Sequence, residues 1–110
     1  MLETIVAALE DGKAEDIVTI DLVGKSSIAD TMVVASGRSD RHVGAVADRV
    51  LRALKEAGHG KAAVEGLQTC DWVLIDAGNV IVHLFRPEVR AFYNLEKMWS
   101  SEIPRERAVI

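Results

Sequence analysis

Cysteine, proline and long apolar runs are scarce in this chain of 110 residues. Cys70 is the only cysteine, so no internal disulfide can form, and a lone thiol is not a zinc site, which needs about four clustered ligands. No stretch approaches the roughly 20 apolar residues that cross a bilayer. The first twelve residues hold three acidic and no basic residues, unlike the basic start of a signal peptide. We therefore expect a cytoplasmic protein with no membrane contact.

Basic charge is also in short supply. The chain has 13 Lys and Arg against 17 Asp and Glu, a formal net charge of −4. Proteins that hold nucleic acid by its phosphates usually carry a surplus of basic residues. The acidic balance therefore argues against direct, sequence-specific nucleic-acid binding and favours a basic protein as the partner.

Apolar residues, in contrast, are plentiful at 49% of the chain, which is enough for a hydrophobic core without disulfides or metals. With only two prolines there is no Pro/Gly-rich linker, and we find no internal repeat. We expect one globular domain over residues 1–99. The apolar pattern stops after Trp99, so residues 100–110 are expected to form a loosely ordered tail.

Periodicity predicts an order of α-β-β-α-(β)-β-β-α, an α/β (α+β) fold in which helices flank a mixed sheet. Apolar spacing of three and four residues marks the helices, and β-branched runs mark the strands. The predicted helices cover residues 2–12, 39–57 and a stretch from Pro87 to Trp99. The predicted strands cover residues 17–23, 31–35, 62–66, 72–76 and 80–85, of which the third is a short edge strand.

The last two strands flank Ala77, Gly78 and Asn79 and predict a β-hairpin. Side chains alternate along a strand, so a two-residue turn places two sets on opposite faces. The first face is wholly aliphatic and predicts core: Val73, Ile75, Val80, Val82 and Leu84. The second face is mixed: Trp72, Leu74, Asp76, Ile81, His83 and Phe85.

This mixed face has two interpretations. In one, a helix covers it, and Asp76 and His83 form hydrogen bonds at its edge. In the other, the face is partly exposed and binds a partner, because aromatic side chains rimmed by polar groups are typical of protein interfaces. The residues alone leave both interpretations open.

Motifs for nucleotide or metal binding are incomplete. Gly24-Lys25-Ser26 matches the end of a phosphate-binding loop, but Thr19 stands where that loop needs its first glycine. The three histidines, His42, His59 and His83, fall on a predicted helix, a loop and a strand, which does not favour a metal site. His42 is expected at the surface or in contact with the preceding loop. We predict no metal and no cofactor.

Catalytic arrangements are equally hard to assemble. Cys70 precedes Asp71, and a neighbouring carboxylate raises the pKa of a thiol. Asp76 and His83 are placed to pair diagonally across the hairpin, but no nucleophile completes the group. No acidic residue is followed two positions later by another, the spacing that a two-metal nucleotidyltransferase site needs. We predict no catalytic residues and no enzyme activity.

Two long segments, Asp16–Val50 and Glu65–Trp99, closely resemble the ribosomal silencing factor family, also called Iojap-related. Each matching piece is short, but their joint order and spacing are highly specific. Asn79 departs from the aspartate common at its place in the family, and Thr31 and Met32 replace a more aromatic pair. The matching pieces are Gly24–Asp30, Ser36–His42, Asp71–Gly78, Val80–His83 and Tyr93–Trp99.

The resemblance implies a fold with a nucleotidyltransferase-like core but without catalysis. It implies binding to the large ribosomal subunit through the fourteenth large-subunit ribosomal protein, which lies on the face that meets the small subunit. Occupation of that face would block subunit joining and repress translation in starvation or stationary phase. A homodimer is also implied. The alternatives are a nucleotidyltransferase-like enzyme and an RNA-binding module.

Transfer of the family pattern to matching positions implies a partner-binding set drawn from the mixed hairpin face and the last predicted helix. Trp72 would be its anchor, and the charged members would set orientation. The remaining members are Asp76, His83, Tyr93, Glu96 and Lys97.

Overall fold

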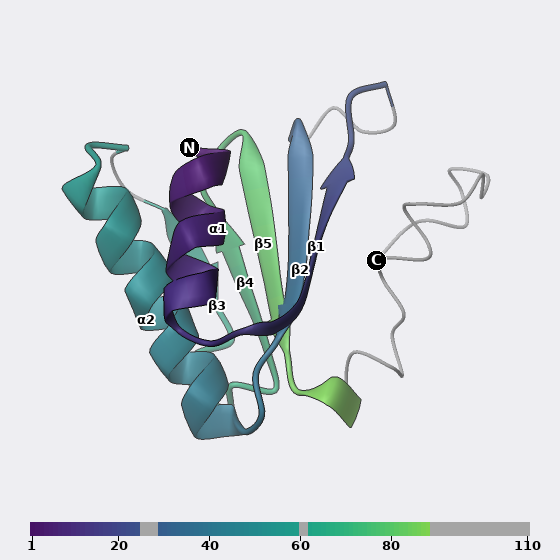
Figure 1. Cartoon of the computed structure of the whole chain (residues 1–110), viewed down its shortest axis with the longest axis vertical. Helices are drawn as coiled ribbons and strands as arrows, with labels where there is room; N and C mark the ends of the chain where they lie inside the picture. The colour runs from purple at the N-terminus through teal and green to yellow at the C-terminus, as the bar shows by residue number, and fades with distance from the viewer. Residues whose placement is uncertain (25–28, 60–61, 89–110) are drawn as a thin grey trace.

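Within its described residues, a computed structural model of the chain shows the helices α1 and α2 and five strands, and Pro87 and Glu88 are helical as well (Figure 1). The structure describes residues 1–24, 29–59 and 62–88. The observed order confirms the predicted fold class. The part of the predicted last helix beyond Glu88 and the tail 100–110 lie outside the described residues. The domain boundary at Trp99 therefore stays a prediction. The elements are α1 Leu2–Asp11, β1 Glu15–Asp21, β2 Thr31–Ser36, α2 Asp40–Glu56, β3 Ala63–Glu65, β4 Trp72–Asp76 and β5 Val80–Phe85.

The five strands form one mixed sheet in the order β1-β2-β5-β4-β3. β2 and β5 run parallel, and every other neighbouring pair is antiparallel. Parallel strands need a long crossover, and here α2, β3 and β4 all lie between β2 and β5 in the chain. The short β3 forms one edge of the sheet, as predicted.

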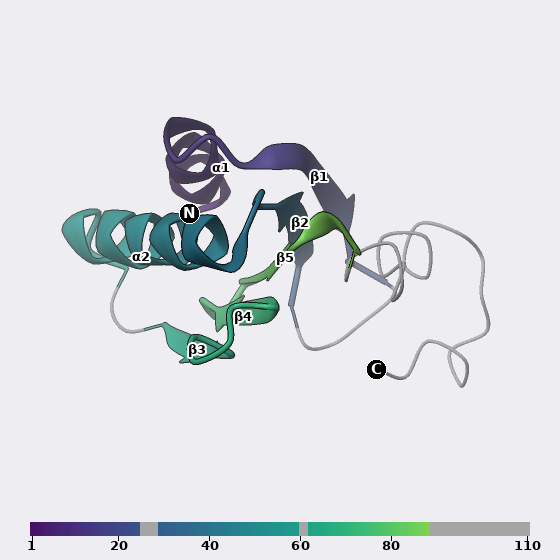
Figure 2. The same cartoon turned by 90° about the horizontal axis from the view of Figure 1, so that it is seen from below.

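Both helices cover the same face of the sheet (Figure 2). Their apolar stripes pack on the aliphatic side chains of the inner strands to form the main core. This is the face that the hairpin pattern predicted to be core. Its fully buried members are Ile5 and Leu9 of α1, Val43, Ala47 and Val50 of α2, and Val33, Ala35, Val73, Ile75 and Val82 of the sheet.

α2 has a defined signal at its N-terminal end. Ser39 is the N-cap, and its hydroxyl accepts a hydrogen bond from the main-chain N–H of His42 at 3.1 Å. The His42 ring accepts from the N–H of Arg38 at 2.9 Å through Nδ1 and lies 2.8 Å from the Gly12 carbonyl through Nε2. His42 thus joins the end of α1 to the start of α2, which confirms its predicted contact with the preceding loop.

The β4–β5 hairpin closes through the two-residue loop Gly78–Asn79. Ala77 N–H donates to the Val80 carbonyl at 3.0 Å, and Gly78 has a φ of 92°. A glycine with positive φ at the first loop position is characteristic of a type II′ turn. The register pairs Trp72 with Phe85 and Ile75 with Val82, so the two predicted faces are confirmed.

The tip of the hairpin also holds the start of β2. The Asn79 carbonyl oxygen accepts hydrogen bonds from Asp30 N–H at 2.9 Å and Thr31 N–H at 3.2 Å. These hydrogen bonds hold the segment between β1 and β2 against a hairpin that lies about fifty residues further along the chain.

β1 differs from its predicted range. It spans Glu15–Asp21 rather than residues 17–23. A bulge lies at its start, where Asp16 has a φ of 50° and the register shifts between Glu15 and Val18. The strand ends at Asp21 because the Asp21 carboxylate accepts a hydrogen bond from Val23 N–H at 3.0 Å, which turns the chain.

Gly66 and Gly58 offer a matched test of this backbone. Both have positive φ, 91° and 78°, but a Cβ at Gly58 would meet open space, whereas one at Gly66 would overlap the carbonyl oxygen of Trp72. We expect Gly58→Ala to lower the free energy of unfolding by about 1 kcal/mol. Gly66→Ala should lower it by about 3 kcal/mol, because steric overlap adds to the backbone strain.

Urea unfolding followed by circular dichroism measures both values. Equal losses in the two variants would show that the close approach of Gly66 to Trp72 is not tight in solution.

Candidate functional site

The second face of the sheet has no helix on it within the described residues (Figure 2). A separate apolar cluster lies there, with Trp72 and Ile81 packed against it. Leu22 and Ala29, from the connection between β1 and β2, contribute to its edge. We call this cluster and the side chains beside it the open sheet face. Its buried apolar members are Ile20, Leu22, Ala29, Met32, Val34 and Phe85.

Three rings meet on the open sheet face. Trp72 lies 5.1 Å from Phe85 and 5.8 Å from His83 between ring centroids, and His83 stacks on Phe85 at 5.9 Å with an interplanar angle of 6°. The strand register causes this arrangement, since Trp72 is opposite Phe85 and diagonal to His83. Ring pairs at such distances stabilise each other by about 1 kcal/mol beyond their burial.

A hydrogen bond links two of these rings. The Trp72 indole N–H donates to Nδ1 of His83 at 2.9 Å. An indole N–H only donates, so Nδ1 must be unprotonated. His83 is 5% exposed, and this burial lowers the pKa of its ring to about 4 from the usual 6.5. The imidazole is therefore neutral at pH 7.

The carboxylates at the two ends of β4, Asp71 just before it and Asp76 at its last position, have separate structural partners. Asp76 accepts a hydrogen bond from Gly78 N–H at 2.9 Å rather than pairing with His83, so the diagonal Asp76–His83 pair expected from the hairpin gives way to the Trp72–His83 bond. Asp71 forms an ion pair with Arg86 at 2.8 Å. Within residues 1–24, 29–59 and 62–88, no group of three or more His, Cys, Asp and Glu side chains is placed to hold a metal ion.

The structure brings together half of the predicted partner-binding set. Trp72, Asp76 and His83 all lie on the open sheet face. The other three, Tyr93, Glu96 and Lys97, lie outside the described residues. Sequence reasoning missed the contributions of Ile20, Met32 and Val34, because the hairpin pattern says nothing about which strands pair with it. Their alternation within β1 and β2 was the available signal.

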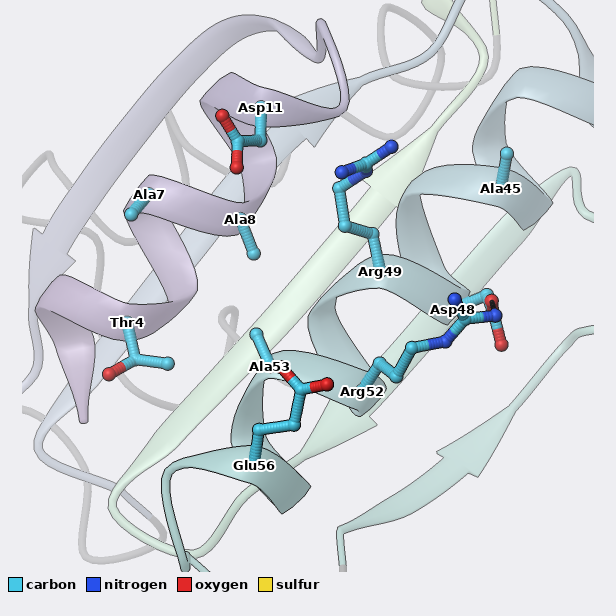
Figure 3. A pocket seen from close by; sticks show the side chains of 10 residues that line it. All are labelled: Thr4, Ala7, Ala8, Asp11, Ala45, Asp48, Arg49, Arg52, Ala53 and Glu56. Atoms are coloured by element: carbon cyan, nitrogen blue, oxygen red, sulfur yellow. Dashed lines mark hydrogen bonds and ion pairs between the residues drawn. The ribbon is translucent and has the colours of Figure 1, made fainter.

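A groove of about 560 Å³ lies on the far side of the molecule, between α1 and α2 (Figure 3). Small side chains such as Ala7, Ala8 and Ala53 form much of its lining. Arg52 and Asp48 at its side form an exposed ion pair at 2.7 Å, which contributes little to stability. Among the described residues, no histidine, cysteine or aromatic side chain lines the groove, so this lining offers no imidazole base, no thiol and no stacking platform.

Cys70 shows no sign of activation. Burial raises the pKa of its thiol, and Asp40 and Asp71 raise it further. Its Sγ donates to the Leu67 carbonyl at 3.1 Å. The expected effect of Asp71 is thus confirmed, and at neutral pH the thiol stays protonated.

The lowered pKa of His83 predicts how stability depends on pH. The folded pKa lies below the unfolded one, so the unfolded chain takes up a proton first as the pH falls. The His83 contribution is therefore complete above about pH 6.5 and lost between about 6.5 and 4, with a total loss of about 3 kcal/mol.

The measurement is urea unfolding at several pH values on the wild type, His83→Asn and the exposed control His59→Gln. We expect the wild type and His59→Gln to lose stability in this interval more steeply than His83→Asn. Parallel curves for all three proteins would contradict a depressed His83 pKa.

Comparison with known proteins adds a family to this geometry. The sequence profile of a family described as "Ribosomal silencing factor during starvation" matches residues 1–109. The chain is 54% identical over 99 residues to a protein of Zymomonas mobilis named ribosomal silencing factor. The match covers 90% of this chain and 74% of that protein. A more distant mouse relative, 31% identical over 102 residues, is named mitochondrial assembly of ribosomal large subunit protein 1; the match covers 90% of this chain and 45% of that protein.

A solved structure agrees with the fold. The crystal structure of a Chromobacterium violaceum protein superposes with a TM-score of 0.88 at 41% identity, covering 94% of this chain and 86% of that one. No described helix is long and apolar enough to span a membrane. With a family profile that spans nearly the whole chain and relatives of this similarity, the chain belongs to the ribosomal silencing factor family.

Proposed function

We propose that this chain binds the large ribosomal subunit through the fourteenth large-subunit ribosomal protein, and that the bound chain sterically blocks the small subunit. Translation would thereby be repressed in starvation or stationary phase. The observation that carries the proposal is the open sheet face with its Trp72–His83–Phe85 cluster, in a member of the ribosomal silencing factor family.

The chemistry of this face supports docking to a protein. Trp72 is half-buried and held by neighbours on the same face, so it offers a large ring at little cost in conformational entropy. Asp76 and Glu65 lie on the same face by the strand register. Together with the net charge of −4, these carboxylates favour a basic partner.

The size of the chain supports a steric mechanism. Its shortest dimension is 21 Å. Atoms in contact across an interface lie about 4 Å apart. A body of this thickness on the intersubunit face would hold the two subunits well beyond contact distance, without any chemical step.

The proposal has further parts, which the family resemblance implies. The chain acts without catalysis, in the cytoplasm where bacterial ribosomes work. Tyr93, Glu96 and Lys97 extend the docking surface from the last predicted helix, and the free protein forms a homodimer. The mouse relative, named for assembly of the ribosomal large subunit, supports the choice of subunit.

Truncation of Trp72 tests the docking surface directly. We expect Trp72→Ala to weaken binding to purified large subunits by about 2 kcal/mol, roughly thirtyfold, because an aromatic anchor at the centre of an interface is lost. Sedimentation of mixed subunits on a density gradient measures co-migration and the fraction of joined ribosomes.

The matched control is Leu51→Ala, which removes a half-buried apolar side chain from the helical layer. It should leave binding unchanged. A wild-type chain that stays at the top of the gradient, with joining unaffected, would reject the proposed function. A folded Trp72→Ala protein with wild-type affinity would reject this surface.

The charge of Asp76 gives a second test. Asp76→Asn keeps an oxygen to accept from Gly78 N–H but removes one negative charge. We expect it to slow association with large subunits a few-fold and to reduce the salt dependence of the association rate, because complementary charges steer the encounter.

The control Asp48→Asn makes the same charge change on α2, in the opposite layer. It should leave the association rate within about twofold of the wild type, since a change of net charge alone has a smaller effect than a charge in the interface. Stopped-flow measurements over a salt series compare the three proteins, and equal slopes would argue against Asp76 at the interface.

A further inference from the structure

We propose that His83 donates a hydrogen bond from Nε2 to a neutral carbonyl oxygen of the docked partner, while its Nδ1 holds Trp72 in place. This inference rests on the proposed docking through the open sheet face. It makes His83 a positioning residue for Trp72 and a specificity-determining contact for the partner.

The first step is the protonation of the ring. Trp72 N–H occupies Nδ1 at 2.9 Å, so Nδ1 carries no proton. A neutral imidazole has one N–H, which must then be at Nε2. The bond to Trp72 therefore determines which tautomer the partner meets.

The second step is that Nε2 has no partner among the described residues. The one hydrogen bond of the His83 side chain is the bond to Trp72. In the described part of the chain, the one side-chain nitrogen that is both fully enclosed and without a hydrogen-bond partner is Arg86 Nε. His83 Nε2 also lacks a partner, but it is not fully enclosed. Although His83 as a whole is only 5% exposed, its Nε2 N–H is thus a donor left without a partner in the described part of the chain.

The third step is the charge around the ring. On β4 and β3, Asp76 and Glu65 share the face with His83. On β2, the side chains of that face are Met32, Val34 and Ser36, none of them charged. A carboxylate on the partner would be repelled by the two acids, and an ammonium group has no lone pair to accept the Nε2 proton. A neutral carbonyl oxygen satisfies both conditions.

The fourth step is rigidity. His83 stacks on Phe85, which is fully buried, and also contacts Trp72, so that the three ring centroids form a triangle with sides of 5.1, 5.8 and 5.9 Å. The ring thus meets the partner in a fixed orientation, so little entropy is lost when the hydrogen bond forms.

Two amide variants separate the two nitrogens. His83→Asn places an acceptor oxygen near the position of Nδ1 but no donor near Nε2. His83→Gln places a donor near Nε2 but no acceptor at Nδ1. The chain has two tryptophans, so a Trp99→Phe background makes Trp72 the single indole reporter.

We expect His83→Asn to keep the fluorescence emission of Trp72 and to bind purified large subunits about tenfold more weakly, as for one lost uncharged hydrogen bond. We expect His83→Gln to shift the Trp72 emission, because the indole N–H loses its acceptor. Wild-type affinity in His83→Asn would overturn the donor role. Unchanged emission in His83→Gln would overturn the positioning role.

Nitrogen-15 NMR of the wild-type imidazole provides a measurement that no misfolded variant can obscure. The free protein should show the proton on Nε2, and that proton should exchange more slowly when the purified fourteenth large-subunit protein is added. A proton on Nδ1, or unchanged exchange, would overturn the inference. A wild-type chain that binds neither large subunits nor that protein would reject the proposed function itself, which keeps the two failures distinct.

Discussion

The parallel pairing of β2 with β5 is the constraint on which the rest of the structure depends. It places a strand from the first half of the chain beside the hairpin from the second half. Through it, Val33 joins Val82 on the helical side, while Val34 joins His83 on the other side. A slip of one residue in this pairing would exchange the two sets of side chains. Both the core and the open sheet face therefore depend on one register.

The two faces of the sheet differ in composition. The helical side carries most of the buried aliphatic area and so most of the stability. The open sheet face carries aromatic rings together with a neutral imidazole and carboxylates. Such polar groups are costly to bury in a core, and their combination with aromatic rings is typical of protein interfaces. Because both faces belong to the same strands, packing on the helical side fixes the strand backbones and so holds the side chains of the open sheet face in place.

Local patterns were enough to predict much of this. The hairpin ends, the capped α2 and the separation of the aliphatic face from the mixed one all follow from spacing and turn residues that act over a few positions. The bulge at Asp16 and the extra strand residues before Ile17 could not be predicted this way, because they arise from pairing with β2. The Trp72–His83 bond was missed for a related reason: the diagonal contact with Asp76 has the more familiar chemistry, but the turn N–H of Gly78 takes that carboxylate.

The anchor between the hairpin tip and the start of β2 has a consequence for how residue 79 tolerates change. Both hydrogen bonds from Asp30 and Thr31 end on the main-chain oxygen of Asn79, and the residue itself is exposed. This long-range contact is thus made by main-chain atoms alone and does not depend on the side chain of residue 79. An aspartate, an asparagine or a serine at this position would preserve the connection equally, so evolutionary drift there leaves the architecture untouched.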